Sequence, residues 1–123
     1  MSIESSEAWY TRPVFFVADC AESLRFYEKL GFHEAWRYEE DGSVIVAQVD
    51  REGAELILCQ NAKRAGGGRL FVSLSFGQAN RLAAVYSKFG IEMPDSRWGM
   101  PVKVVTDPDG NEILFSDDEL NAG

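Results

Sequence analysis

The spacing of hydrophobic residues in the first half of the chain predicts a strand followed by a capped helix. Residues 13–17 are β-branched and aromatic, as in a buried strand. Apolar side chains then recur along one stripe of a helix predicted from Ala21 to Leu30. Asp19 and Glu22 have the spacing of a capping box, and Gly31 supplies a stop after the helix.

Three further segments predict an antiparallel meander after the helix. The expected strands are 32–39, 43–49 and 55–60, joined by turns at 40–43 and 50–53 that each contain glycine. The first half therefore reads as one strand-helix-strand-strand-strand unit, abbreviated βαβββ.

The second half of the chain repeats the first. The run 27–32 returns as 86–91, and the hairpin 50–58 returns as 107–115 in the same order. Between the halves, residues 61–68 contain three consecutive glycines, which is typical of a flexible linker. The pattern predicts a duplicated architecture.

The predicted fold is α+β, with two tandem βαβββ modules forming a cleft-bearing, partly closed mixed sheet. We expect a single domain over residues 1–123, because 123 residues and 13.7 kDa fit one domain. Module one would span about 10–60 and module two about 69–117, on either side of the linker.

Composition and charge narrow the class of protein. The net charge of −8 disfavours nucleic acid, which needs a basic face, and no apolar run approaches the roughly 20 residues of a membrane span. Residues 1–7 are polar and acidic, unlike a secretory signal. Two cysteines, Cys20 and Cys59, make no disulfide framework. We expect a cytoplasmic protein without nucleic-acid or membrane partners.

Two stretches of the chain resemble a known superfamily. The run 15–32 resembles the opening of glyoxalase/bleomycin-resistance/extradiol-dioxygenase proteins, the vicinal-oxygen-chelate superfamily. Trp98-Gly99-Met100, followed by the turn 107–111, resembles their closing signature. The resemblance extends from about Arg12 to Ser116, and it implies a ligand cleft and frequent pairing of modules in a homodimer.

The resemblance also implies where a metal would be held. Enzymes of the superfamily place one ligand on the first strand and one on the last strand of each module. Counted from the repeat, these positions are Arg12, Phe71, Ile57 and Leu114, and none of the four ligates a divalent cation. The single histidine, His33, lies on a different strand. We therefore expect no metal and no cofactor.

Two carboxylates keep an alternative open. Glu55 and Glu112 each follow a tight turn, and a pair of carboxylates can hold a hard cation or act in acid–base catalysis. Relative to the metal positions, we expect them to point to the opposite face of their strands. Duplication accounts for their equivalent positions in the two modules.

Aromatic residues outside the predicted core indicate a binding surface. Trp36 and Tyr38 alternate on one face of the second strand, and Trp98 lies in a polar, glycine-containing segment. Such rings favour flat or cationic ligands. The predicted ligand-binding residues are Trp36, Tyr38, Trp98, Arg12, Phe71, Ile57 and Leu114, and no residue is assigned a catalytic role.

The function implied by the resemblance is metal-independent sequestration of an antibiotic or other natural product, as in bleomycin-resistance proteins. Such proteins are acidic homodimers. Many carry an arginine shortly after Trp-Gly, whereas Met100 and Pro101 follow here. This difference leaves the identity of the ligand undetermined. The alternative is a glyoxalase- or dioxygenase-like enzyme acting on a small metabolite. A dioxygenase needs two histidines and a carboxylate, and the chain has a single histidine. The enzyme that this leaves is a metal-independent one that uses Glu55, Glu112 or Arg12.

Overall fold

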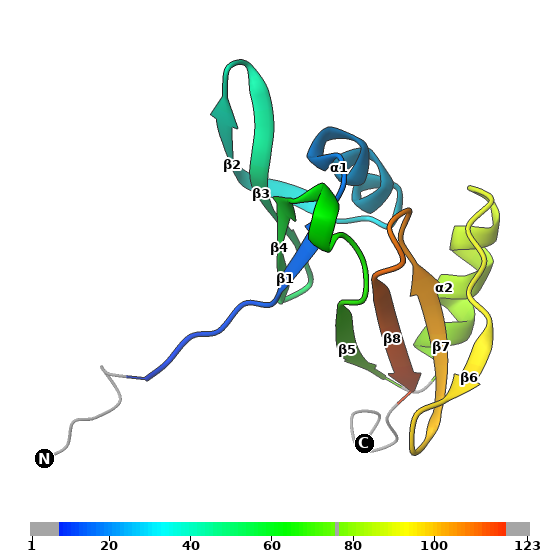
Figure 1. Ribbon diagram of the computed structural model, residues 1–123. Coiled ribbons are helices and arrows are strands. Elements are labelled where there is room, and N and C mark those ends of the chain that lie inside the picture. Colours follow the sequence, from blue (N-terminus) through cyan, green and yellow to red (C-terminus); the bar gives the residue numbers. More distant parts are fainter. Residues whose placement is uncertain (1–7, 76, 118–123) are drawn as a thin grey trace, which may run out of the picture.

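Two four-stranded mixed sheets, each accompanied by one helix, make up the computed structural model (Figure 1). The structure describes residues 8–75 and 77–117. The elements are β1 (Val14–Val17), α1 (Cys20–Lys29), β2 (His33–Glu40), β3 (Ser43–Arg51), β4 (Ala54–Gln60), the 3₁₀ helix η2 (Ala62–Arg64), β5 (Arg69–Leu74), α2 (Gln78–Ser87), β6 (Asp95–Arg97), β7 (Pro101–Thr106) and β8 (Glu112–Asp117). The α+β class and the duplicated βαβββ order are confirmed.

The two sheets have the same topology. Sheet A has the strand order β1-β4-β3-β2, and sheet B has the order β5-β8-β7-β6. In each sheet the first and last strands of the module are parallel neighbours, and the other pairs are antiparallel. The sheets stay separate and do not close into a barrel.

Local signals place the ends of α1 and the first hairpin. The side chain of Asp19 accepts a hydrogen bond from the backbone nitrogen of Glu22 at 3.1 Å, as the predicted cap requires. Gly31 ends the helix with a φ of +93°. Asp41 and Gly42 both have positive φ, which is the geometry of a two-residue hairpin turn that matches the twist of its strands.

The connection between the modules is more ordered than its glycine content indicates. It contains η2, and the backbone nitrogen of Gly66 donates to the carbonyl of Phe16 at 3.1 Å. The nitrogen of Gly68 donates to Asn111 Oδ1 at 2.8 Å, and a Cβ at this glycine would lie 2.6 Å from the ring of Phe15. Gly68 is thus required for close approach of the two modules.

One continuous core joins the modules through two tyrosines at equivalent positions of the repeat. Tyr27 of α1 donates to Asp107 Oδ2 of module two at 3.0 Å, and Tyr86 of α2 donates to the carbonyl of Leu30 at 2.7 Å. Burial raises the pKa of both phenols, and the Asp107 carboxylate raises that of Tyr27 further. Both tyrosines therefore stay neutral donors, each holding the other module.

The two helices α1 and α2 have 10 residues each, and neither has the length and apolar character needed to cross a bilayer. Residues 1–7, for which the sequence predicts no secretory signal, lie outside the described residues.

Candidate functional site

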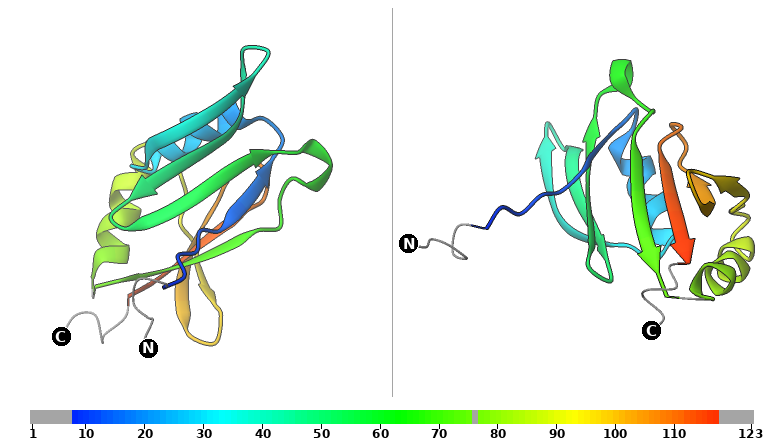
Figure 2. Two further views of the ribbon diagram at one scale, coloured as in Figure 1. Left: turned by 90° about the vertical axis from the view of Figure 1, so that its left-hand side faces the viewer. Right: turned by 90° about the horizontal axis from the view of Figure 1, so that it is seen from below.

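Each sheet has a face that points away from the shared core, and we call these the open faces. On β4, Leu56 and Leu58 are fully buried against the core, so the alternating residues Glu55, Ile57 and Cys59 lie on the open face of sheet A. The left panel of Figure 2 shows sheet A from this side, with α1 behind it. The open face is therefore accessible in the single chain.

Gln48 organises the open face of sheet A. Its side-chain oxygen accepts hydrogen bonds from Arg12 Nη1 at 2.7 Å and from Trp36 Nε1 at 2.9 Å. Its amide nitrogen donates to Asp50 Oδ1 at 2.9 Å and to Glu55 Oε1 at 2.8 Å. The residue is only 4% exposed, and all of its donor and acceptor capacity is used. If the Gln48 amide were turned over, its NH2 group would face the N–H donors of Arg12 and Trp36. Gln48 therefore holds both side chains in one orientation.

The segment before β1 completes this network. The hydroxyl of Tyr10 donates to Glu55 Oε1, and the Arg12 guanidinium lies 5.3 Å from the centroid of the Tyr10 ring. Arg12 makes no salt bridge within the described residues. Its positive charge is stabilised by an amide oxygen and an aromatic face, both of them neutral groups.

The open face of sheet B carries an aromatic pair beside apolar strand residues. The rings of Phe71 and Trp98 lie 5.3 Å apart at an interplanar angle of 33°. Phe71 is opposite Leu114 on the neighbouring strand, and Leu114 is opposite Val104. Leu114 is 4% exposed whereas Trp98 is 52% exposed, so this face has a buried apolar residue in its floor and a tryptophan that presents its surface to solvent.

The structure brings the seven predicted residues together in two groups on separate sheets. Gln48 on sheet A is surrounded by Trp36, Arg12 and Ile57. Tyr38 lies two residues after Trp36 on the same face of β2, opposite Val46. The other group, on sheet B, consists of Phe71, Trp98 and Leu114. No strand of one sheet pairs with a strand of the other in the described residues.

The register differs from the sequence count at one position. Val14, not Arg12, is opposite Ile57, in the place that Phe71 holds opposite Leu114. The reason is that Val14 precedes Tyr27 by 13 residues, whereas Phe71 precedes the equivalent Tyr86 by 15. Arg12 nevertheless reaches the open face, because its side chain extends to Gln48.

The expectation that Glu55 and Glu112 point to the opposite face is wrong. Each lies two residues from a predicted metal position, and side chains two apart in a strand share a face. Glu55 joins the Gln48 network, while Glu112 Oε1 accepts from Arg69 Nε at 3.1 Å. The two carboxylates therefore lie on different sheets.

The positions implied for a divalent metal hold the apolar residues Val14, Ile57, Phe71 and Leu114. Within residues 8–75 and 77–117, no three His, Cys, Asp or Glu side chains are placed to hold a metal ion. His33 is exposed at the start of β2. The residues present do not fit the metal that the superfamily resemblance implies.

The two cysteines differ in their surroundings. Cys20 is buried at the first position of α1, and burial raises the pKa of its thiol to about 11, so it stays protonated at neutral pH. Cys59 is partly exposed on the open face of sheet A, opposite Phe16 and Val46. The rate at which a thiol reagent modifies Cys59 should therefore report whether that face is accessible.

Gln48 is the functional residue that the sequence reading missed. It is the only polar residue in the run 44–49, where alternation places it on the same face as Val46. A lone amide in a buried apolar strand requires partners, and that requirement is the signal that could have found it.

Replacing Arg12 with alanine is expected to lower the free energy of unfolding by about 1 kcal/mol, because Gln48 Oε1 loses a charge-assisted donor and Tyr10 loses its cation. Urea denaturation measures the loss. Arg25→Ala, an exposed arginine on α1, is the matched control. Equal stability of the two variants would show that Arg12 contributes nothing to the network.

The architecture thus consists of two βαβββ modules with aromatic side chains on their open faces and apolar residues at the implied metal positions. The model of the Glyoxalase/Bleomycin resistance protein/Dioxygenase superfamily matches residues 8–115, and the chain belongs to this superfamily.

Solved structures with the same fold include both binding proteins and a resistance protein. The bleomycin-binding protein from Streptomyces verticillus, complexed with copper(II)-bleomycin, is 20% identical, with a TM-score of 0.72 over 92% of this chain and 98% of that chain. The antibiotic-binding protein TnmS3 from Streptomyces sp. CB03234 is 21% identical, with a TM-score of 0.67 over 89% and 96%. The fosfomycin resistance protein FosX from Mesorhizobium loti is 16% identical, with a TM-score of 0.66 over 92% and 94%. No curated protein sequence matches the chain.

Proposed function

We propose that the protein binds a planar or cationic natural product of the antibiotic type on its open faces and sequesters it in the cytoplasm without chemical change. The observation that carries the proposal is the pair of ordered aromatic groups, Trp36 held by Gln48 and Trp98 stacked near Phe71. Aromatic side chains held in place before binding lose little freedom when a ligand arrives.

The expected affinity follows from these groups. Aromatic and cation–π contacts contribute roughly 0.5–2 kcal/mol each, so two or three of them with apolar burial reach about micromolar affinity. The net charge of −8 attracts a cationic ligand, with faster association at low salt. Two neighbouring structures bear the names of bleomycin-binding and antibiotic-binding proteins, which favours the same class of ligand here.

The proposal includes a homodimer. Several large apolar side chains on or beside the open faces are each 40% or more exposed: Val14, Trp36, Trp98 and Met100. This is more exposed apolar surface than a monomer favours. A second copy related by a twofold axis would cover these faces and form two equivalent clefts. Sedimentation equilibrium at micromolar concentration is expected to give twice the chain mass. A single 13.7 kDa species would contradict the dimer.

Tryptophan fluorescence tests the binding function directly. Titration with a metal-free bleomycin-type glycopeptide is expected to quench the emission in a saturable way, because Trp36 and Trp98 contact the ligand. Modification of Cys59 by a maleimide should slow in parallel, since this thiol lies on the same open face as Trp36. A panel of aromatic natural products that changes neither signal would reject the proposal.

The second candidate is a glyoxalase- or dioxygenase-like enzyme that works without a metal. Glu55 favours it, because this carboxylate lies on an open face, where hydrogen bonds from Gln48 and Tyr10 orient it as a general base would have to be oriented. Turnover of a hemithioacetal or a catechol, lost in Glu55→Gln, would establish the enzyme and displace sequestration.

A further inference from the structure

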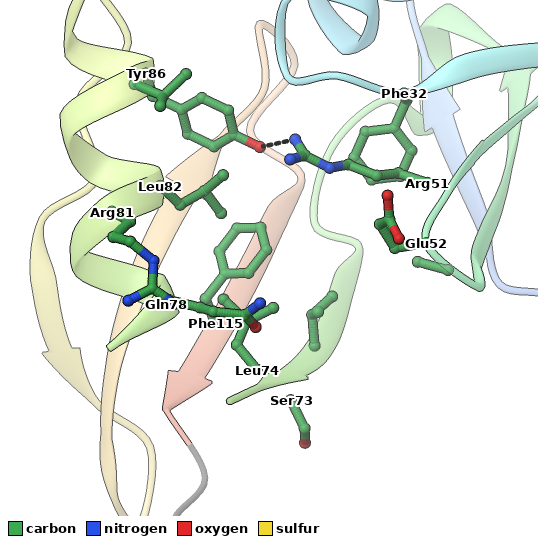
Figure 3. A pocket seen from close by; sticks show the side chains of 13 residues that line it. Phe32, Arg51, Glu52, Ser73, Leu74, Gln78, Arg81, Leu82, Tyr86 and Phe115 are labelled. Atoms are coloured by element: carbon green, nitrogen blue, oxygen red, sulfur yellow. Dashed lines mark hydrogen bonds between the residues drawn. The ribbon is translucent and has the colours of Figure 1, made fainter. Parts of the chain in front are cut away.

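A separate cavity of about 540 Å³ lies where the two modules meet, on the helix side of sheet B (Figure 3). Module one supplies Phe32 and residues of the β3–β4 turn, and module two supplies α2, β5 and β8. Phe115, on the strand next to Phe71, faces this cavity, whereas Phe71 faces the opposite side of the sheet. The cavity is therefore distinct from both open faces.

Its walls combine apolar side chains with two arginines. Leu82, Phe115 and Val72 provide an apolar lining, while Arg51 enters from module one and Arg81 from α2. The volume falls within the range of about 300–1,000 Å³ that small-molecule pockets occupy. The cavity thus has the size and the mixed lining of a ligand site.

Arg51 has a structural role that occupies part of its guanidinium. Its Nη1 donates to the carbonyl of Leu30 at the C-terminal end of α1 and to the hydroxyl of Tyr86 at 3.2 Å. A cation at this end of a helix is favourable. The other N–H groups of the guanidinium have no acceptor among the described residues, so they can donate to a ligand.

Neither arginine has a carboxylate partner within the described part of the chain. Among the described residues, Glu52 is the only acidic one that lines the cavity, and it forms no salt bridge with any of them. Arg51 and Arg81 therefore leave the cavity with a local positive charge in a chain whose net charge is −8.

We infer that this cavity is a second small-molecule site, specific for an amphipathic anion such as an aliphatic carboxylate. The carboxylate would pair with Arg81 at the α2 side, attracted also by Arg51, and the chain would lie over Leu82 and Phe115. Guanidinium groups are the preferred partners of carboxylates. This ligand has the charge opposite to that expected at the open faces, so the site extends beyond the proposed function.

Methyl NMR of the full chain tests the site with three probes of equal chain length: decanoate, decanol and decyltrimethylammonium. Decanoate is expected to shift the methyl signals of Leu82 and Val72 saturably, decanol more weakly, and the cation not at all. No tryptophan lines the cavity, so the fluorescence that reports on the open faces should not change. Failure of the open-face proposal would leave this result unaffected.

Charge variants then locate the carboxylate. Arg81→Gln is expected to weaken decanoate binding about fivefold, and Glu52→Gln to strengthen it about twofold by removing an acidic group from the lining. Lys88→Gln removes the same charge from the end of α2, outside the cavity, and should leave the affinity unchanged. Absence of saturable shifts, equal binding of the anionic and cationic probes, or an unaltered affinity in Arg81→Gln would each overturn the inference.

Discussion

Replacing Asp107 with alanine is expected to lower the free energy of unfolding by about 3 kcal/mol. The Asp107 carboxylate is 5% exposed and accepts four hydrogen bonds: from the Tyr27 hydroxyl at 3.0 Å, from the nitrogens of Asp109 and Asn111 at 2.8 and 2.9 Å, and from Asn111 Nδ2 at 3.0 Å. Truncation leaves buried donors from both modules without this acceptor. Urea denaturation at neutral pH measures the effect.

The internal repeat supplies a matched control for this variant. Asp50 is the equivalent residue of module one, is only partly buried and accepts one side-chain hydrogen bond, from Gln48. Asp50→Ala should therefore cost about 1 kcal/mol. If the two variants were equally stable, the carboxylate of Asp107 would not be what joins the modules.

Replacing Trp98 with alanine is expected to weaken binding of a bleomycin-type ligand about tenfold to a hundredfold, because one stacking surface and its aromatic pairing with Phe71 are both lost. The fold should persist, since half of this side chain is exposed. Calorimetric titration measures the affinity without relying on the tryptophan removed.

Phe89→Ala is the control for this substitution. Phe89 is about as exposed as Trp98, but it follows α2 and does not belong to the aromatic pair of Phe71 and Trp98. Its removal should not change the affinity. Comparable losses in both variants would indicate nonspecific hydrophobic adsorption and would refute binding at Trp98.

Features set by neighbouring residues could be predicted from the sequence. The Asp19 cap, the Gly31 stop and the turn at Asp41 and Gly42 depend on a few adjacent residues, and the structure has all of them. The duplication extended these predictions to module two. Local chemistry was therefore sufficient for the order of elements and for the α+β class.

Features that depend on pairing between strands could be predicted only in part. The length of the connection before α1 differs between the modules, so counting back from Tyr27 reached Arg12 instead of Val14. The role of Gln48 depends on Arg12, Trp36 and Glu55, which three other segments bring to it. The cavity between the modules has no local pattern at all, because Arg51 and Arg81 meet there only through the packing of the whole chain.

The reciprocal bonds of Tyr27 and Tyr86 determine how the chain comes apart. Each tyrosine is anchored in its own helix and bonded to the opposite module, so opening either half removes a partner from the core of the other. The two modules should then behave as one cooperative unit with a single unfolding transition. The slowest-exchanging amide protons of both sheets would share one opening free energy, and neither repeat expressed alone would fold.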